Sequence, residues 1–173
     1  GISNCFAYQL AIANTIAKER GLQGFVSVQG HYNLIFREEE REMKRYCDEQ
    51  NIAMTPYSAL ASGRLAKHPG VTSQRLEQDT YAKGKYDASS DLDLEIIQRV
   101  EEIASKHHVS MSEVSLSWLM SKVASPVVGA TKLKHVDTAV LATELELTEE
   151  EKQYLEEPYQ PHLLVGVMAT NPK

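Results

Sequence analysis

Residues 129–135 combine the end of an apolar run with a basic helical start, a pattern that can hold an anion. Free backbone N–H groups at the start of a helix favour a negative charge. Lys132 and Lys134 stand at the unfavourable end of the helix dipole, at a cost of about a few tenths of a kcal/mol each, and a bound phosphate would reverse that sign. Two lysines that only keep a surface soluble explain these residues equally well.

A second cluster, residues 55–65, begins where a predicted strand ends, which is where α/β proteins place their ligands. Its hydroxyls, its glycine and Arg64 could hold a pyrophosphate, and Tyr57 could stack on a flat ring. A turn rich in serine and glycine that binds nothing is the commoner explanation for such a segment in isolation.

Residues 29–33 and 1–4 add amides and hydroxyls at two further strand ends. A ligand amide needs both donors and acceptors, as glutamine and asparagine side chains provide. Each of these two segments, taken alone, is best explained by polar side chains that form hydrogen bonds within the core or within a turn. Four polar clusters at the carboxyl ends of strands in one chain indicate a shared site.

Composition excludes several other functions. The chain has no G-x-S-x-G, H-E-x-x-H, P-loop or C-x-x-C motif. Its net charge of −6, from 18 Lys+Arg against 24 Asp+Glu, argues against a nucleic-acid partner. No apolar run approaches the roughly 18 residues of a membrane span. Cys5 and Cys47 cannot form a zinc site by themselves, and they fit a reducing compartment, so we expect a cytoplasmic protein without a metal.

The elements that must position these clusters are short apolar runs alternating with helical patterns. Strands are expected at 1–3, 25–28, 52–57 and 126–129. Helices are expected at 7–20, 37–50 and 91–107. Two more are expected to begin at the capping boxes 110–113 and 148–151, and another to follow residue 129. Between them, residues 59–90 form a long connection with few aliphatic residues.

This alternation predicts a parallel sheet built from βα units. A closed barrel of eight units needs at least ~200 residues, so 173 residues cannot close one alone. An open doubly wound sheet fits the pattern, but its G-x-G-x-x-G fingerprint is missing.

Taken in order, the four clusters resemble the carboxyl-terminal half of the aldo-keto reductase family. There, GxSN ends the fifth barrel strand, Q…YN the sixth and YSxLxxGxL the seventh, and GATxxxH leads into the eighth helix. The matching residues are 1–4, 29–33, 57–65 and 129–135. The resemblance implies an α/β fold: the carboxyl-terminal half of a (β/α)8 TIM barrel, from the tip of strand 5 through helix 8, with a carboxyl-terminal helix and tail. Residues 1–173 would form a single partial domain in which 59–90 is a long loop covering the cofactor.

The resemblance also implies NADPH-dependent reduction of a small-molecule aldehyde or ketone to an alcohol. The nicotinamide would stack on Tyr57, and its carboxamide would be hydrogen-bonded by Ser3, Asn4 and Gln29. The pyrophosphate and ribose would be lined by Ser58, Leu60, Ser62 and Arg64. The adenosine end, with Lys132 at the 2′-phosphate, would be bound by Thr131, Lys132, His135 and Thr138. Ala139 departs from the asparagine that many members have beside the adenine.

The family's catalytic Asp, Tyr, Lys and His lie on the first four βα units, which this sequence lacks. We therefore expect a fragment that holds cofactor but is inactive alone. A half barrel leaves unpaired strand edges, so we expect it to need the missing amino-terminal half or to self-associate. The alternatives are a non-catalytic nucleotide-binding or regulatory module of the same barrel family, and an unrelated phosphate-binding barrel fragment in which Tyr57 and Gln29 have no role.

Overall fold

Three short parallel strands form the sheet on which the chain is built. The computed structural model describes residues 1–71 and 78–170. The strands lie in the order β1 (Ile2–Ser3), β2 (Ser27–Gln29) and β3 (Ala53–Met54). They are joined through α1 (Ala7–Glu19) and α2 (Met43–Gln50), which makes two βα crossovers. The predicted parallel sheet is therefore confirmed, with strands shorter than the apolar runs suggested.

The expected strand at 126–129 is wrong. In the structure this segment is bonded to the chain around β3 only through Ser125 N–H to the Met54 carbonyl, 3.4 Å, and Val127 N–H to the Pro56 carbonyl, 2.8 Å. Pro126 between them has no N–H to donate to a ladder. Val127 is 46% exposed, so the segment is not a buried strand.

The helix expected at 37–50 is confirmed only over its second part, because the chain forms two separate pieces. A 3-10 turn, η1 (Glu38–Glu40), precedes α2, and Glu42 between them has φ −142°. The carboxylate of Glu38 is buried and accepts hydrogen bonds from Tyr159 Oη, 2.8 Å, and from the His162 backbone N–H, 2.7 Å. These contacts attach η1 to the carboxyl-terminal tail.

The connection at 59–90 contains more structure than expected. Its described parts hold η2 (Ala61–Ala66), α4 (Thr80–Tyr86) and η3 (Asp87–Ser89). Residues 72–77 of the expected cofactor-covering loop lie outside the described residues. Asp79 caps α4 by accepting a hydrogen bond from the Ala82 N–H, 2.8 Å. This cap gives the segment a fixed helix start that its composition does not suggest.

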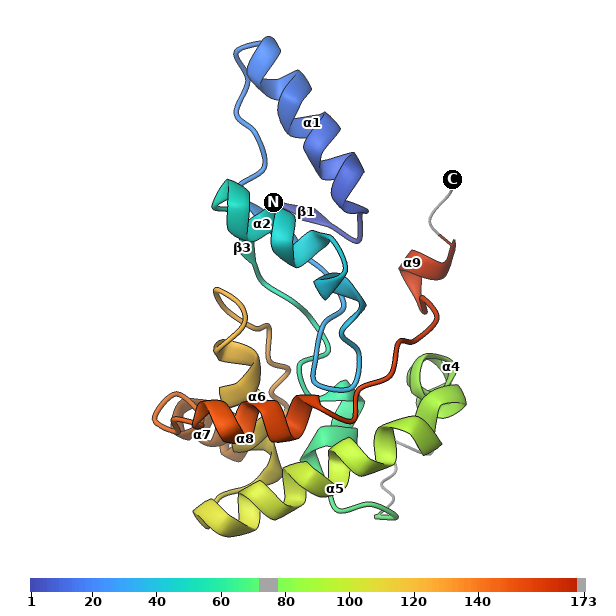
Figure 1. Ribbon diagram of the computed structural model, residues 1–173, viewed down its shortest axis with the longest axis vertical. Helices are drawn as coiled ribbons and strands as arrows, with labels where there is room; N and C mark the ends of the chain where they lie inside the picture. The colour runs from blue at the N-terminus through green and yellow to red at the C-terminus, as the bar shows by residue number, and fades with distance from the viewer. Residues whose placement is uncertain (72–77, 171–173) are drawn as a thin grey trace.

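The remaining helices are α5 (Ser90–His107), α6 (Met111–Met120), α7 (Leu133–Leu141), α8 (Glu149–Glu156) and α9 (Val167–Thr170). Both predicted capping boxes are confirmed, at the starts of α6 and α8. In Figure 1, α1 stands at one end of the long axis and α5 lies near the other, with the strands between them.

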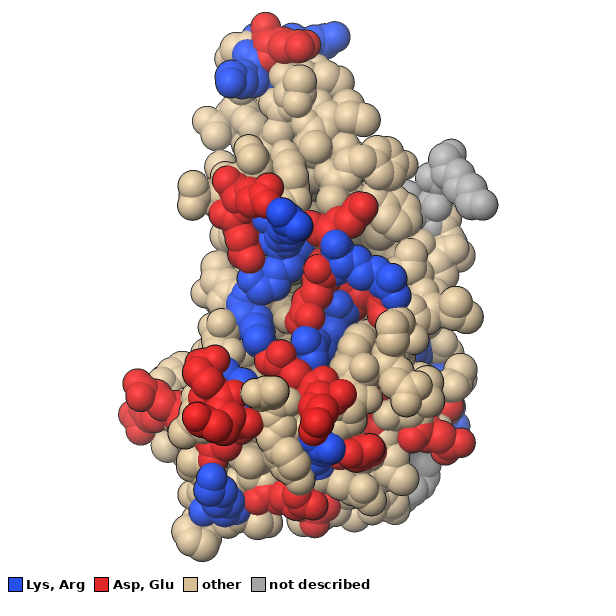
Figure 2. All heavy atoms as spheres, viewed as in Figure 1, with Lys and Arg blue, Asp and Glu red and all other residues tan. Residues whose placement is uncertain are grey.

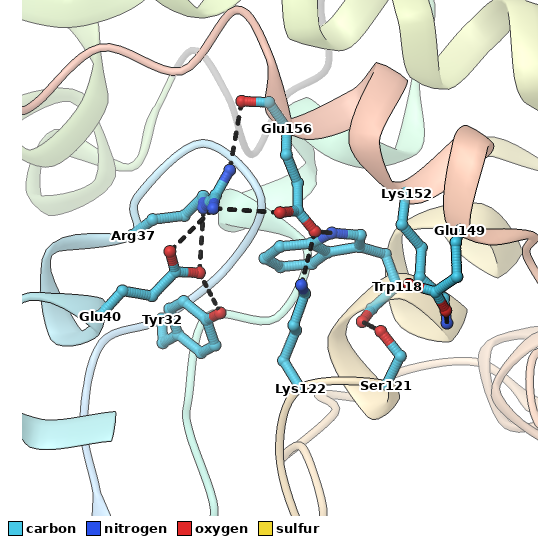
Figure 3. Close-up of polar contacts among 9 residues, drawn as sticks. All are labelled: Tyr32, Arg37, Glu40, Trp118, Ser121, Lys122, Glu149, Lys152 and Glu156. Carbon is cyan, nitrogen blue, oxygen red and sulfur yellow. Dashed lines mark hydrogen bonds and ion pairs between the residues drawn. The ribbon is translucent and has the colours of Figure 1, made fainter. Parts of the chain in front are cut away.

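Glu156 joins three separate parts of the structure (Figure 3). Its carboxylate accepts hydrogen bonds from Trp118 Nε1, 2.8 Å, and Lys122 Nζ, 2.7 Å, and pairs with the Arg37 guanidinium at 3.3 Å. Burial opposes ionisation of this carboxyl, but these donors together lower its pKa. Arg37 also pairs with Glu40, whose carboxylate accepts the Tyr32 hydroxyl at 2.5 Å.

Figure 2 shows lysine and arginine side chains gathered in a band across one face, interleaved with acidic ones. A shallow hollow of about 360 Å³ there is lined by Arg37, Glu40, Lys44, Arg45, Asp48, Glu49, Lys122 and Glu156. Each of these eight charges has an opposite partner within the same set. The band is therefore a network of ion pairs rather than a basic surface.

Glu151 provides a test of how α8 is attached. Its buried carboxylate accepts hydrogen bonds from Lys106 Nζ and His107 Nε2, both at 2.7 Å, and from the Thr148 backbone N–H at 3.0 Å. Burial acts to raise the pKa, but these donors lower it to about 2. Glu151→Gln should lower the free energy of unfolding at pH 7 by about 1–3 kcal/mol, measured by urea denaturation.

The contribution of Glu151 to the free energy of unfolding should depend on pH. A carboxyl with a depressed folded-state pKa stabilises the fold above its ordinary value of 4.5, and that contribution is lost as the pH falls toward about 2. Wild type should therefore lose its advantage over Glu151→Gln across that window. Glu146→Gln, at an exposed position, is the matched control. An advantage unchanged between pH 7 and pH 2.5 would contradict this account.

Candidate functional site

Beyond β1, the chain turns sharply and is held against the end of β2. Asn4 has φ +53°, in the left-handed region that asparagine adopts more readily than most residues. Its backbone N–H donates to the Gln29 carbonyl at 3.1 Å, and the Ser3 hydroxyl donates to the same oxygen at 3.1 Å. Asn4 Nδ2 donates in turn to Ser3 Oγ at 2.9 Å. Ser3 and Asn4 at the end of β1 are therefore held against the backbone of Gln29 at the end of β2.

Tyr57 connects this pair of strand ends to the third. Its backbone N–H donates to the Gly30 carbonyl at 2.9 Å, and its hydroxyl donates to Asn4 Oδ1 at 3.0 Å. Burial, with smaller contributions from Tyr81 and Glu39, raises the pKa of Tyr57 to about 12, so the phenol stays neutral. Ser3, Asn4, Gln29 and Tyr57, here called the strand-end group, thus lie together at one edge of the sheet.

The loop that follows Tyr57 contains an unusual concentration of left-handed backbone. Positive φ occurs at Ser58 (+61°), Ala61 (+47°), Ser62 (+56°) and Gly63 (+100°). For a residue other than glycine this conformation costs roughly 1–2 kcal/mol, and such strain gathers at ligand-binding loops. The N–H groups of Ala61 and Gly63 donate within the loop, to the carbonyls of Ser58 and Leu60, each at 2.8 Å. A phosphate could therefore be contacted here by the hydroxyls of the loop and by the side chain of Arg64, rather than by these backbone N–H groups.

Leu60 and Arg64 anchor the same loop. Leu60 packs against the hydrophobic core. The Arg64 guanidinium pairs with Asp87 at 2.6 Å and lies over the Tyr86 ring, 4.9 Å from its centroid. Arg64 Nη1 is buried and has no hydrogen-bond partner among the described residues. One donor of this predicted site residue therefore remains available.

The residues predicted at the adenosine end form a separate group at the start of α7. Lys132 is the N-cap residue of α7 and is exposed. The Thr131 N–H donates to His135 Nδ1 at 3.3 Å, and the Thr138 hydroxyl donates to the Lys134 carbonyl at 2.8 Å. Both partners of each of these hydrogen bonds lie within residues 131–138. The predicted site residues thus fall into two groups, each held by its own contacts.

A buried polar cluster behind Tyr57 was not predicted. His31, 1% exposed, stacks on Tyr57 with centroids 5.6 Å apart, and its Nε2 lies 2.7 Å from the Tyr86 hydroxyl. Burial and the nearby Lys85 lower the pKa of His31 to about 2, so the ring is neutral. Asn33 Nδ2 donates to the Tyr86 hydroxyl at 3.1 Å and to the Ser58 carbonyl at 3.0 Å. Of this cluster, His31, Asn33 and Ser58 lie in motifs that the sequence singled out, whereas Tyr86 and Lys85 lie outside them.

A second hollow lies at the opposite end of the strands. It measures about 480 Å³ and is lined by residues 51–54 before and within β3, by 121–124, and by Cys47 and Asp48. Ligands of parallel α/β sheets bind at the carboxyl ends of the strands, so this hollow is not the candidate site. Within residues 1–71 and 78–170, no three His, Cys, Asp or Glu side chains are placed to hold a metal ion. In the same part of the chain, the helices are too short or too polar to cross a bilayer.

Known proteins are similar to this chain in sequence and in fold. Residues 1–160 match the model of the aldo/keto reductase family. An aldo-keto reductase of Fusarium vanettenii is 41% identical over 167 residues, and the aldo-keto reductase dtxS3 of Metarhizium robertsii is 42% identical over 167. Versiconal hemiacetal acetate reductase of Aspergillus parasiticus is 39% identical over 165 residues.

These alignments cover 96%, 96% and 93% of this chain, but only 45%, 45% and 48% of the respective relatives. The chain thus spans less than half the length of these three relatives. Among solved structures, the thermostable aldo-keto reductase Tm1743, in complex with the inhibitor epalrestat, has a TM-score of 0.65 at 24% identity. That similarity covers 91% of this chain and 47% of the other, and it concerns the fold. The chain belongs to the aldo-keto reductase family, with the α/β fold of its members.

Proposed function

We propose that the chain is the carboxyl-terminal half of an NADPH-dependent aldo-keto reductase barrel and supplies most of its cofactor site. The observation that carries this proposal is the strand-end group, in which Asn4 is bonded to both Gln29 and Tyr57. When bound, the nicotinamide would provide the hydride that reduces a small-molecule aldehyde or ketone to an alcohol. The match to less than half of each relative supports a half barrel.

The chain's own residues would bind and orient the cofactor. Ser3, Asn4 and Gln29 would hydrogen-bond the nicotinamide carboxamide, because they offer both donors and acceptors at one edge. The Tyr57 ring is braced by His31 and by its hydroxyl bond to Asn4, which suits a fixed stacking surface. The pyrophosphate and ribose would lie along Ser58, Leu60, Ser62 and Arg64, and the adenosine 2′-phosphate end along Thr131, Lys132, His135 and Thr138.

The proposal assigns no catalytic residue to this chain. The family's general acid and its supporting residues would come from the amino-terminal half, so the chain alone would bind cofactor without turnover. Apolar side chains left exposed on α1 and α7 support the need for another polypeptide: Ile12 (55%), Ile16 (43%), Leu133 (84%), Val136 (49%) and Val140 (57%). The free, buried thiols of Cys5 and Cys47 are consistent with a cytoplasmic location.

Lys132 tests the cofactor preference. Lys132→Glu should raise the Kd for NADPH about 10- to 100-fold, because a charged partner of the 2′-phosphate becomes a like charge. The Kd for NADH should change less than about threefold. Fluorescence titration of the chain measures both, and Lys134→Glu, also exposed near the start of α7, controls for the general loss of positive charge. An equal increase in the Kd for NADPH and for NADH would show that Lys132 does not bind the 2′-phosphate.

Tyr57 separates this proposal from a site that binds only phosphate. Tyr57→Ala should weaken NADPH binding about 10-fold through loss of the stacking surface, while Tyr57→Phe should retain most of the affinity. A fragment that binds a sugar phosphate at α7 alone would show no effect of either change. The titration is repeated with circular dichroism of each variant, so that unfolding is recognised separately.

The exposed apolar faces should drive association. Light scattering coupled to size-exclusion chromatography should find dimers or larger species of the chain at micromolar concentration. Leu133→Glu, at the most exposed of these side chains, should shift the population toward monomer. A clean monomer that stays soluble at high concentration would contradict this part of the proposal.

A further inference from the structure

Lys85 of α4 is a buried cation that the strand-end group does not use. The residue is 5% exposed, and its Nζ donates to the Ser58 hydroxyl at 3.0 Å. Among the described residues, no carboxylate forms an ion pair with it; Asp79 acts only at a distance. A lysine ammonium has three protons to donate, and among residues 1–71 and 78–170 only the Ser58 hydroxyl accepts one of them.

Three tyrosine rings surround this ammonium. Its nitrogen lies 5.0 Å from the centroid of Tyr57, 5.6 Å from that of Tyr81 and 5.3 Å from that of Tyr86. Cation–π attraction offsets part of the cost of burying the charge, but it provides no counter-charge. Burial lowers the pKa of Lys85 to about 8, so the group still carries a proton at neutral pH. A buried charge of this kind is stabilised strongly by a bound anion.

The carboxyl-terminal tail covers the same place. A Cβ on Gly166 would lie 2.9 Å from Tyr81 Oη and 3.7 Å from Lys85 Cδ, and Gly166 itself has φ +61°. Figure 1 shows α9 and the chain before it running beside α4. Lys85 is therefore enclosed between the tail and the tyrosines, where water screens its charge poorly.

Arg64 brings a second cation to the same rings. Its guanidinium lies over Tyr86, as Lys85 does, and its Nη1 is buried without a hydrogen-bond partner among the described residues. Both cations border the loop of left-handed residues at 58–63. Lys85 is bonded to Ser58 at its start, and Arg64 directly follows its end. Two cations beside one loop, each with donors that no described residue accepts, match a group with two adjacent negative charges.

We infer that Lys85 is a further ligand of the cofactor's pyrophosphate, supplied by α4 and acting with Arg64 on the loop that begins at Ser58. This inference rests on the proposed function for the identity of the ligand. The anion site itself rests on Lys85, Arg64 and the loop. Inorganic pyrophosphate and NADPH are therefore used as separate probes.

The test is isothermal titration of the 173-residue chain with each probe. Lys85→Met keeps the length of the side chain and removes its charge, so it should weaken both pyrophosphate and NADPH about 10- to 100-fold. Lys85→Arg should restore most of the affinity. Lys83→Met, on the exposed side of the same helix, should change either Kd less than about twofold.

A stability measurement distinguishes a binding lysine from a structural one. Lys85→Met removes a buried charge without a counter-ion, so its Tm without ligand should equal or exceed that of wild type. Equal binding of both probes by wild type and Lys85→Met, or no binding of pyrophosphate by wild type, would overturn the inference. If pyrophosphate binds in a way that depends on Lys85 but NADPH does not bind, the anion site is supported and the proposed function is contradicted.

Discussion

The hydrogen bonds made just beyond the ends of β1, β2 and β3 determine where the candidate cofactor residues lie. Parallel strands end at the same edge, and the register of each pair fixes which residues meet there. Asn4 is bonded to Gln29 through its backbone and to Tyr57 through its side chain, while Tyr57 is bonded to Gly30. These contacts join three βα units that lie far apart in the sequence, so a single flat ligand can reach residues from all of them.

The structure tolerates several unfavourable features around this edge. Left-handed residues follow Tyr57, and two buried groups lack a partner among the described residues: His31 Nδ1 has no hydrogen bond, and the Lys85 ammonium has no ion pair there. By contrast, two carboxylates of α8 have several partners each: Glu156 is bonded to Trp118, Lys122 and Arg37, and Glu151 to both cations at the end of α5. Strain and unpaired charge concentrated at one place, in an otherwise satisfied structure, are typical of a ligand site.

Local signals in the sequence predicted local structure well. The capping boxes at Ser110 and Thr148 form because both partners lie within four residues of each other. The helix expected at 37–50 forms only as α2, and its first part is instead the 3-10 turn η1, where Glu38 binds a tail more than 120 residues away. The four motifs located most of the candidate site, whereas Lys85 gave no signal, because its importance arises from contacts with Ser58 and the tyrosines that only the folded chain creates.

A crystal structure of this chain with NADPH bound tests the central claim most directly. The account predicts the nicotinamide against the Tyr57 ring, with its carboxamide within hydrogen-bond distance of Asn4 and Gln29. It also predicts the pyrophosphate along the loop after Tyr57. Cofactor bound at the amino ends of the strands, beside residues 51–54, or on α7 alone with the strand ends empty, would contradict it.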